Sequence, residues 1–507
     1  MRSYIEHIRL IGRSSRLSLL QLETVRKKIQ VAFPGTRVEI IARSSRGDEL
    51  QNIPLHTVEG SDFFTQDIFD ALQNGEADIA VHSLKDMSSE HFFGSNRFAV
   101  VDRDDTRDVA IFNSNIMDKI ESGQTIVIGT CSPRREEMAT VFLKKALPQL
   151  HDRIIIETKP IRGNVETRLR KLDSGEYDAT ILAAAGLNRL LNSAADAPLL
   201  KELLKDKKLM ILPLVECVPA PCQGAIVAEA HPANQDAVAV LNGINDTKLL
   251  EDCVKEKKTA QQYGQGCLQQ FGVTTLTYEH TSVLYAAGRD QHKTTFTNWY
   301  TLPVLEAAQK IFFSSTDHMG SFFDYAYHTS EVDIQSPVIY ISNYKAVQNP
   351  ALIASLQTRR VWAAGTKTWY ELARQGIWVE GCADAFGLEF LVQAWAMPLV
   401  NISKDDVQII TNEQGAANWR QKGWNALGTY ETISQPKKEL ATRIAEADII
   451  FWTSFQQYQS YKDVLKENVQ HVCPSGETAV LLRSAGLDPL VFPNIKAFQQ
   501  WRKTSFL

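Results

Sequence analysis

Short apolar runs alternate along the chain with stretches in which apolar residues recur every three or four positions. Residues 125–128 form one such run, and Leu19, Leu22, Val25 and Ile29 mark one face of a helix. Several predicted strands lead through a polar turn into a predicted helix. This order predicts an α/β protein, in which ligands bind at the carboxyl ends of the strands.

A short internal repeat indicates two similar lobes. Residues 74–81 and 174–181 share the frame Gly-Glu-x-Asp, and in both we expect a helix to end at glycine before a short apolar strand. The repeat is too short to prove a duplication. Two such units predict a pair of doubly wound lobes that face each other across a cleft.

Composition limits the class of protein. The 507 residues are 44% hydrophobic and 22% charged, which predicts a soluble protein of three or four domains. A formal net charge of -5 argues against nucleic-acid binding, and the sequence shows neither a signal peptide nor a membrane span. Seven cysteines without a Cys-x-x-Cys pair suggest no disulfide framework and no metal site, so we expect a cytoplasmic location.

Arginines occupy the turns where helices begin. The first such turn holds Arg13 and Ser15, and it could be an ordinary solvated helix start. Arg134 and Arg135 are adjacent at a later helix start, where positive charge opposes the helix dipole. They are better explained as partners of an anionic ligand, and Arg168 on a third helix fits the same explanation.

Two further residues have the chemistry of a reactive site. Asp86 follows a short strand, where an ionised carboxylate could stabilise a cationic intermediate; it could also be a helix cap or the partner of Lys85. Cys267 directly follows Gly266, with Gly264 two residues further upstream, and an accessible thiolate there could carry a covalent adduct. A buried structural cysteine is the alternative.

Six ordered motifs resemble those of hydroxymethylbilane synthase, also called porphobilinogen deaminase, over about residues 7–295. The motifs are residues 81–86, 129–135, 162–169, 184–190, 219–225 and 266–267. The resemblance implies a dipyrromethane cofactor in thioether linkage to Cys267, with Asp86 as the catalytic aspartate. The implied cofactor-binding residues are Lys85, Ser132, Arg134, Arg135, Arg162 and Arg168. The implied substrate-binding residues are Arg13, Ser15, Ser83, Thr130, Arg189 and Gln223.

The implied chemistry agrees with the arginine-rich turns. Porphobilinogen has an acetate and a propionate, so each condensed ring adds two negative charges that arginines can bind. Loss of ammonia leaves an azafulvenium ion, which a fixed Asp86 carboxylate would stabilise. The chain departs from the family at residues 56–64, where the usual lysines of the active-site lid are missing; Arg43 or Arg46 could substitute. Pro133 stands where the family commonly has leucine.

Residues from about 305 onward predict a second α/β succession. Strands are expected at 311–315, 338–343, 361–366, 407–411 and 449–454. This half resembles uroporphyrinogen-III synthase in residues 364–366, 383–389, 429–432, 453–455 and 475–479. The resemblance implies Tyr430 as an acid or orienting group and Thr453 as a substrate ligand. A tyrosine at a hinge between lobes is the alternative for Tyr430, and residues 305–345 are less family-like than the rest.

These observations predict an α/β fold with two periplasmic-binding-protein-like lobes, a small α+β cofactor-bearing domain and a two-lobed α/β synthase module. The expected boundaries are 1–105 with 220–243, 106–219, 244–300 and 305–507. The predicted activity condenses four porphobilinogens to hydroxymethylbilane and then closes it to uroporphyrinogen III, with inversion of ring D, in heme biosynthesis. We expect a monomer whose ligands are porphobilinogen and hydroxymethylbilane. The alternatives are a deaminase with an inactive C-terminal scaffold, or a two-lobed anion-binding protein.

Overall fold

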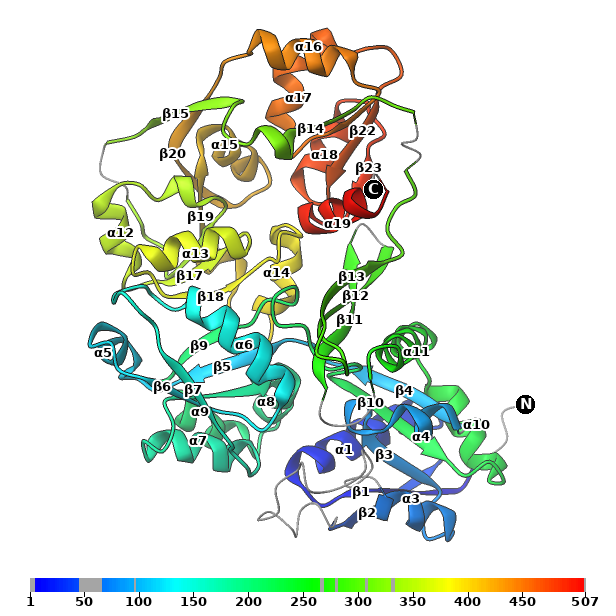
Figure 1. Cartoon of the computed structure of the whole chain (residues 1–507). Coiled ribbons are helices and arrows are strands. Elements are labelled where there is room, and N and C mark those ends of the chain that lie inside the picture. The colour runs from blue at the N-terminus through cyan, green and yellow to red at the C-terminus, as the bar shows by residue number, and fades with distance from the viewer. Residues whose placement is uncertain are drawn as a thin grey trace.

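The structure is a computed structural model, which describes residues 5–44, 66–94, 97–264, 269–278, 281–305, 309–329 and 333–505. The described strands form five sheets with helices packed around them (Figure 1). The mixed α/β fold predicted from the apolar periodicity is confirmed. Among the described helices, none is long and apolar enough to cross a membrane.

The first sheet, with its helices, forms lobe 1, and its strand order is β2-β1-β3-β10-β4. Strands β1, β2 and β3 are parallel, while β10 is antiparallel to both β3 and β4. The strands are β1 (His7–Arg13), β2 (Arg37–Arg43), β3 (Ile79–Ser83), β4 (Phe98–Arg103) and β10 (Ala225–Ala230). The helices are α1 (Arg16–Ala32), α3 (Gln66–Gln73), α4 (Ser89–Gly94) and α10 (Gln235–Ile244).

The second sheet, with its helices, forms lobe 2, and its order β7-β6-β8-β5-β9 repeats the pattern of the first. Strand β6 is parallel to β7 and β8, and β5 is antiparallel to β8 and β9. The strands are β5 (Asp108–Phe112), β6 (Ile126–Gly129), β7 (Ile156–Lys159), β8 (Ala179–Ala183) and β9 (Lys208–Ile211). The helices are α5 (Ile116–Glu121), α6 (Pro133–Ala146), α7 (Val165–Asp173), α8 (Ala184–Leu191) and α9 (Ala197–Leu204).

The short sequence repeat occupies equivalent places in the two lobes. Gly75 and Gly175 follow α3 and α7 with φ of 72° and 75°, a conformation that glycine adopts without strain. The repeated aspartates then bind the neighbouring strand: Asp78 accepts from the Arg9 N–H and Asp178 from the Val127 N–H, both at 2.8 Å. The repeat therefore marks one joint between helix and sheet that both lobes use.

A three-stranded antiparallel sheet follows lobe 1 in the chain. Helix α11 (Thr247–Gln261) precedes β11 (Gln270–Tyr278), β12 (Thr281–Arg289) and β13 (Thr295–Tyr300). Glu256 on α11 is fully buried and accepts two hydrogen bonds of 2.9 Å from Arg103. It also accepts from the Cys222 and Thr275 N–H groups at 2.6 and 2.7 Å. One carboxylate thus joins this domain to lobe 1.

The remaining described residues, from 309 to 505, form the C-terminal module, which has two sheets. The larger one, lobe 3, has the order β15-β20-β19-β16-β17-β18, and the smaller, lobe 4, has the parallel order β14-β21-β22-β23. The strands of lobe 3 are β15 (Phe323–Tyr327), β16 (Val338–Ile341), β17 (Arg360–Ala363), β18 (Val379–Cys382), β19 (Val407–Asn412) and β20 (Asn425–Ser434). Those of lobe 4 are β14 (Phe312–Ser314), β21 (Ile449–Phe451), β22 (Gln470–Pro474) and β23 (Leu490–Phe492).

Helices cover both sheets of the module, as the predicted alternation requires. Those of lobe 3 are α12 (Pro350–Leu356), α13 (Thr366–Arg374), α14 (Leu388–Trp395) and α15 (Glu413–Gln421). The later helices are α16 (Lys438–Glu446), α17 (Phe455–Tyr461), α18 (Glu477–Ser484) and α19 (Ile495–Ser505).

The C-terminal module packs directly on lobe 2, with α13 facing α6 and β18 facing β9 (Figure 1). The indole of Trp369 is fully buried, meets the Phe142 ring at 5.1 Å and donates to the Ala146 carbonyl at 3.0 Å. Trp378 meets Phe112 at 5.2 Å in the same way. Apolar residues of both halves therefore share one core, so the two halves are packed together and not merely joined by a linker.

Candidate active site

The predicted ligand-binding turns lie at the carboxyl ends of parallel strands, and serine side chains begin two of the helices that follow. Ser15 caps α1 by accepting from the Ser18 N–H at 3.4 Å. Ser132 caps α6 by accepting from the Arg135 N–H at 3.5 Å. Such caps hold the first turn of each helix with N–H groups at the strand ends, where an anion can bind.

Both arginines at the start of α6 bind one buried carboxylate, that of Asp108. Asp108 is 1% exposed; it accepts from Arg134 and Arg135 at 2.8 Å each and from the Gln223 amide at 2.9 Å. Burial raises the pKa of Asp108, but the two arginines outweigh it and hold the pKa well below its ordinary value. This cluster of Asp108, Arg134, Arg135 and Gln223 is the electrostatic centre of the site.

Arg134 and Arg135 differ in what else they contact. Arg134 is 5% exposed and donates a second hydrogen bond of 2.6 Å to the Val218 carbonyl, so its guanidinium is held from two sides. Arg135 donates to the Ile181 carbonyl at 2.9 Å and is less deeply buried. Their assignment to a cofactor stays a prediction, and the geometry gives Arg134 a positioning role as well.

Lobe 1 brings Lys85 and Asp86 to this cluster on the short helix η2 (Leu84–Asp86), directly after β3. Burial lowers the pKa of Lys85; Asp86 opposes that shift, and Arg135 of lobe 2 adds to it. The lysine is therefore within electrostatic reach of lobe 2. Asp86 is partly exposed on the same turn, and its catalytic role stays a prediction.

Further arginines gather on the lobe 2 side. The pKa of Arg168 is lowered by burial and by the nearby cations Arg135 and Arg162. Its Nε donates to the Gly163 carbonyl at 2.9 Å, which fixes the start of α7. Arg135, Arg162 and Arg168, predicted from two separate motifs, are thus brought together by the fold.

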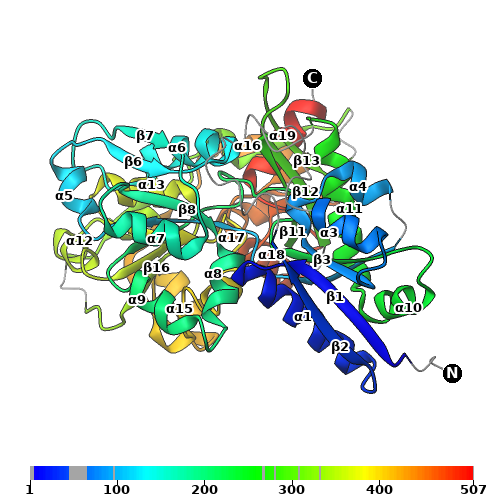
Figure 2. The same cartoon turned by 90° about the horizontal axis from the view of Figure 1, so that it is seen from below.

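The remaining predicted ligands of this half lie around the junction of the lobes. Arg189 on α8 donates to the Gly224 carbonyl at 2.6 Å and to Asp102 at 3.2 Å. Ser83 accepts from Gln21 at 2.7 Å. Thr130 follows β6 and accepts from the Ser132 N–H at 3.1 Å, and Arg13 ends β1. Nearby, α1 and α8 lie side by side where the lobes meet (Figure 2).

Several predictions fall on residues outside the described ranges. Cys267, the predicted point of cofactor attachment, is one of them, and so are Arg46 and the predicted lid at 56–64. Gly264, at the end of the described segment, has φ of 144°, which favours glycine. Arg43 is described and forms an ion pair with Glu76.

The candidates in the C-terminal module lie on different sheets. Tyr430 on β20 is 4% exposed and packs on Tyr325 and Tyr327, with ring centroids 6.0 and 5.9 Å away. Burial raises the pKa of Tyr430 to about 12. Thr453 follows β21, and its N–H and hydroxyl both donate to Gln457 at 3.0 Å. Strand β20 is followed by α16, on the way from lobe 3 to lobe 4, and both roles of Tyr430, in a site or at a hinge, stay predictions.

Asp108 is the functional residue that the sequence reasoning missed. It ends an acidic stretch in which Asp102, Asp104, Asp105 and Asp108 occur within seven residues. Arginines that become buried are usually paired with a carboxylate. The acidic stretch was therefore the signal that could have pointed to a partner for Arg134 and Arg135. Which of the four acids serves could not be read from the spacing, because α6 comes from another part of the chain.

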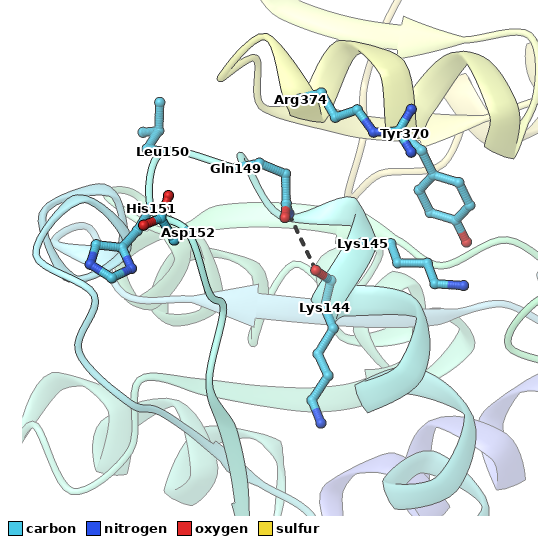
Figure 3. Close-up of a pocket in the computed structure, with 8 residues that line it drawn as sticks. All are labelled: Lys144, Lys145, Gln149, Leu150, His151, Asp152, Tyr370 and Arg374. Carbon is cyan, nitrogen blue, oxygen red and sulfur yellow. Dashed lines mark hydrogen bonds between the residues drawn. The ribbon is translucent and has the colours of Figure 1, made fainter.

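A separate cavity of about 430 Å³ opens between the end of α6 and α13 (Figure 3). Lys144, Lys145 and Arg374 are among its lining residues. None of the predicted site residues lines it, so this cavity is not the candidate active site. It marks the exposed edge of the contact between lobe 2 and the C-terminal module.

Comparisons with known proteins confirm the predicted family of the N-terminal half. The family profile described as porphobilinogen deaminase, dipyromethane cofactor binding domain, matches residues 8–239. The porphobilinogen deaminase of Chromobacterium violaceum is 35% identical over 269 residues, which cover 53% of this chain and 79% of that protein. That of Laribacter hongkongensis is 31% identical over 280 residues, covering 55% and 83%. Among solved structures, the substrate binding protein of an amino acid ABC transporter covers 50% of this chain and 98% of its own, at 14% identity and a TM-score of 0.26.

Proposed function

The chain belongs to the porphobilinogen deaminase family, and from this premise we propose that Asp86, Lys85 and the arginines around Asp108 condense porphobilinogen units into hydroxymethylbilane. Membership of this family supports porphobilinogen deaminase activity in porphyrin biosynthesis and a dipyrromethane cofactor. The observation that carries the residue assignment is that Arg134 and Arg135 both bind the buried Asp108 carboxylate, at 2.8 Å each.

The residues present fit a dipyrromethane. Its two rings have four carboxylates, and the pKa values of Lys85 and Arg168 are both lowered by burial and by neighbouring cations. Like charges held this close repel one another, and a bound polyanion relieves that repulsion. Arg135, Arg162 and Arg168 would hold its carboxylates, and when bound it supplies the free pyrrole α-carbon to which the first substrate ring is joined.

Asp86 would act on the substrate ring that is being added. Departure of ammonia leaves positive charge on that ring, and a carboxylate hydrogen-bonded to the pyrrole N–H stabilises the charge. Asp86 follows β3 of lobe 1 and the arginines belong to lobe 2, so one lobe would stabilise the cation while the other binds substrate carboxylates.

The test is Asp86→Asn, which keeps the shape and removes the charge. We expect porphobilinogen consumption per folded molecule to fall by at least about 10²-fold, with the cofactor still attached. Asp206→Asn, at an exposed aspartate between α9 and β9, is the matched control and should keep the wild-type rate. Near-normal turnover of Asp86→Asn would remove the catalytic role.

The attachment point is tested independently by intact-protein mass. The freshly purified active chain should be heavier than its polypeptide by one dipyrromethane, and Cys267→Ser should lose that mass. Five of the described cysteines are buried, which makes them poor acceptors of an adduct: Cys217, Cys222, Cys253, Cys382 and Cys473. Cys131 is partly exposed, so the mass of Cys131→Ser should be measured beside that of Cys267→Ser. An unmodified mass for the active wild type would contradict the assignment.

We further propose that the C-terminal module closes hydroxymethylbilane to uroporphyrinogen III. The ordered sequence motifs, the two-lobed α/β arrangement and a cluster of polar rings support this. Lys345 lies 3.5 Å from the centre of the Tyr325 ring, beside Tyr430, and burial lowers its pKa. With a pKa of about 12, Tyr430 keeps its proton at neutral pH and could donate it to a leaving hydroxyl.

The product isomer tests this second activity. Hydroxymethylbilane released without a synthase closes to the symmetrical type I ring, so a working module should yield mainly type III from porphobilinogen alone. Tyr430→Phe should shift the ratio toward type I, while Tyr327→Phe, at a 44% exposed tyrosine of the same cluster, should not. Only type I from the full chain would favour the scaffold interpretation, and an unchanged ratio in Tyr430→Phe would leave that tyrosine a packing role.

A further inference from the structure

Two segments connect the deaminase lobes, and the second one also contacts the C-terminal module. The outgoing crossing is residues 104–107, between β4 and β5, and the return crossing is residues 213–224, between β9 and β10. The two crossings contact each other, because the Gln223 amide donates to the Thr106 carbonyl at 2.7 Å. The relative position of the lobes depends on how these segments are held.

Asp384 of the C-terminal module holds the start of the return crossing. It follows β18, is 2% exposed, and accepts from the Leu214 and Val215 N–H groups with one oxygen each, both at 3.2 Å. Its φ of 51° is in the left-handed region, which aspartate and asparagine tolerate better than most residues. Burial raises the pKa of Asp384 to about 6; Arg107 opposes the rise and Glu216 adds to it.

Residues 215–218 of the return crossing make further contacts with the C-terminal module and with the three-stranded sheet. Glu216 accepts from the Thr366 hydroxyl at 3.3 Å and forms an ion pair with Lys496, both of the C-terminal module. The Tyr285 hydroxyl of β12 donates to the Val215 carbonyl at 3.0 Å. A Cβ at Gly272 of β11 would lie 2.2 Å from the Val218 carbonyl oxygen, so the backbones pack closely there.

The far end of this stretch reaches the cluster around Asp108. The Val218 carbonyl accepts the 2.6 Å hydrogen bond from Arg134, and Arg134 shares Asp108 with Arg135. A continuous series of hydrogen bonds and backbone therefore runs from Asp384, through residues 214–218, to the arginines that would bind carboxylates. Few residues separate the two ends, and every contact in the series is buried or partly buried.

We propose that Asp384 is a positioning residue of the deaminase site, which sets the return crossing and, through the Val218 carbonyl, the orientation of Arg134 and Arg135. The C-terminal module then contributes to the first reaction as well as to any chemistry of its own. This inference rests on the deaminase activity and is independent of whether the module closes the ring.

Asp384→Asn is the sharpest variant. An amide has one acceptor oxygen, and its NH2 group would face the second backbone N–H, so one of the two hydrogen bonds is lost while φ remains tolerated. Glu380→Gln is the matched control, because Glu380 lies on β18, binds Arg360 at 2.8 Å and makes its contacts away from the return crossing.

The rate of porphobilinogen consumption is measured per cofactor-bearing molecule, so that lost folding changes the number of sites and not the rate of each. For Asp384→Asn we expect kcat to fall by about 3- to 30-fold and the KM for porphobilinogen to rise. Glu380→Gln should keep both constants within about twofold even if its melting temperature falls. Wild-type constants in Asp384→Asn, or equal losses in the two variants, would overturn the proposal.

A double-mutant cycle tests the route. If Asp384 acts through Arg134, the loss in Asp384→Asn combined with Arg134→Lys should be clearly smaller than the product of the single losses. Independent, multiplicative losses would show that Asp384 does not act through Arg134.

Discussion

Replacing Asp108 with asparagine should lower both stability and activity strongly while changing the shape of the side chain very little. Asp108→Asn leaves the side-chain volume almost unchanged but takes the negative charge from between Arg134 and Arg135. Three charge-assisted or polar hydrogen bonds, of 2.8, 2.8 and 2.9 Å, end on this carboxylate. The amide that replaces it can accept fewer of them, and its own N–H groups face the guanidinium donors.

The magnitude follows from burial. With Asp108 and Arg134 almost fully buried, the variant leaves two cations without a counter-ion in a site that water scarcely reaches. Removing one partner of a buried ion pair typically costs about 3 to 5 kcal/mol. The free energy of unfolding of the apoprotein should fall by that amount. Misplaced arginines should also lower the rate of condensation by about 10²-fold.

The sign of the pH dependence provides a second check. The folded pKa of Asp108 lies below its ordinary value, so the stability it contributes is present above that value and is lost as pH falls through the folded pKa. The deficit of Asp108→Asn should therefore be constant between about pH 5 and 8 and shrink only in stronger acid.

Denaturant titration and porphobilinogen consumption measure both effects, with the exposed Asp206→Asn as the control. A stability within about 1 kcal/mol of the wild type would refute the reasoning, since a surface pair is worth no more than that. A large loss of stability with an unchanged rate per site would refute only the link between Asp108 and the arginines' function.

Three further predictions follow from buried groups. Trp369→Ala removes an indole shared with lobe 2 and should lower the free energy of unfolding by about 3 to 5 kcal/mol; an unchanged denaturation midpoint would show that this contact does not hold the module. Glu256→Gln should cost about 3 to 5 kcal/mol and reduce hydrogen-exchange protection of α11, and wild-type protection would contradict it. Because the pKa of Asp384 is about 6 when folded and therefore above its ordinary value, the stability of the wild type relative to Asp384→Asn should fall as pH rises from about 4 through 6, by about 3 kcal/mol. Parallel stability curves for the two proteins would exclude this.

Local patterns of the sequence determined most of the deaminase elements. The repeated Gly-Glu-x-Asp frame predicted a helix, a turn and a strand in each lobe, and Gly75 and Gly175 have the positive φ that the turn requires. The helix starts at Ser15 and Ser132 were equally local, because a cap depends on residues within one turn. The family of the N-terminal half was also readable, since its motifs are short and ordered.

Tertiary structure alone decided which partners these elements have. Asp108 binds arginines 26 and 27 positions away, and Asp384 binds backbone 169 and 170 positions away. No periodicity encodes such pairs, because they depend on how whole sheets pack. The same holds for Trp369 and Trp378 of the C-terminal module, whose rings lie against Phe142 and Phe112 of lobe 2. Hydrophobic burial is non-directional, so the sequence indicates only that these rings are buried. The packing of lobe 2 on the C-terminal module decides which residues cover them.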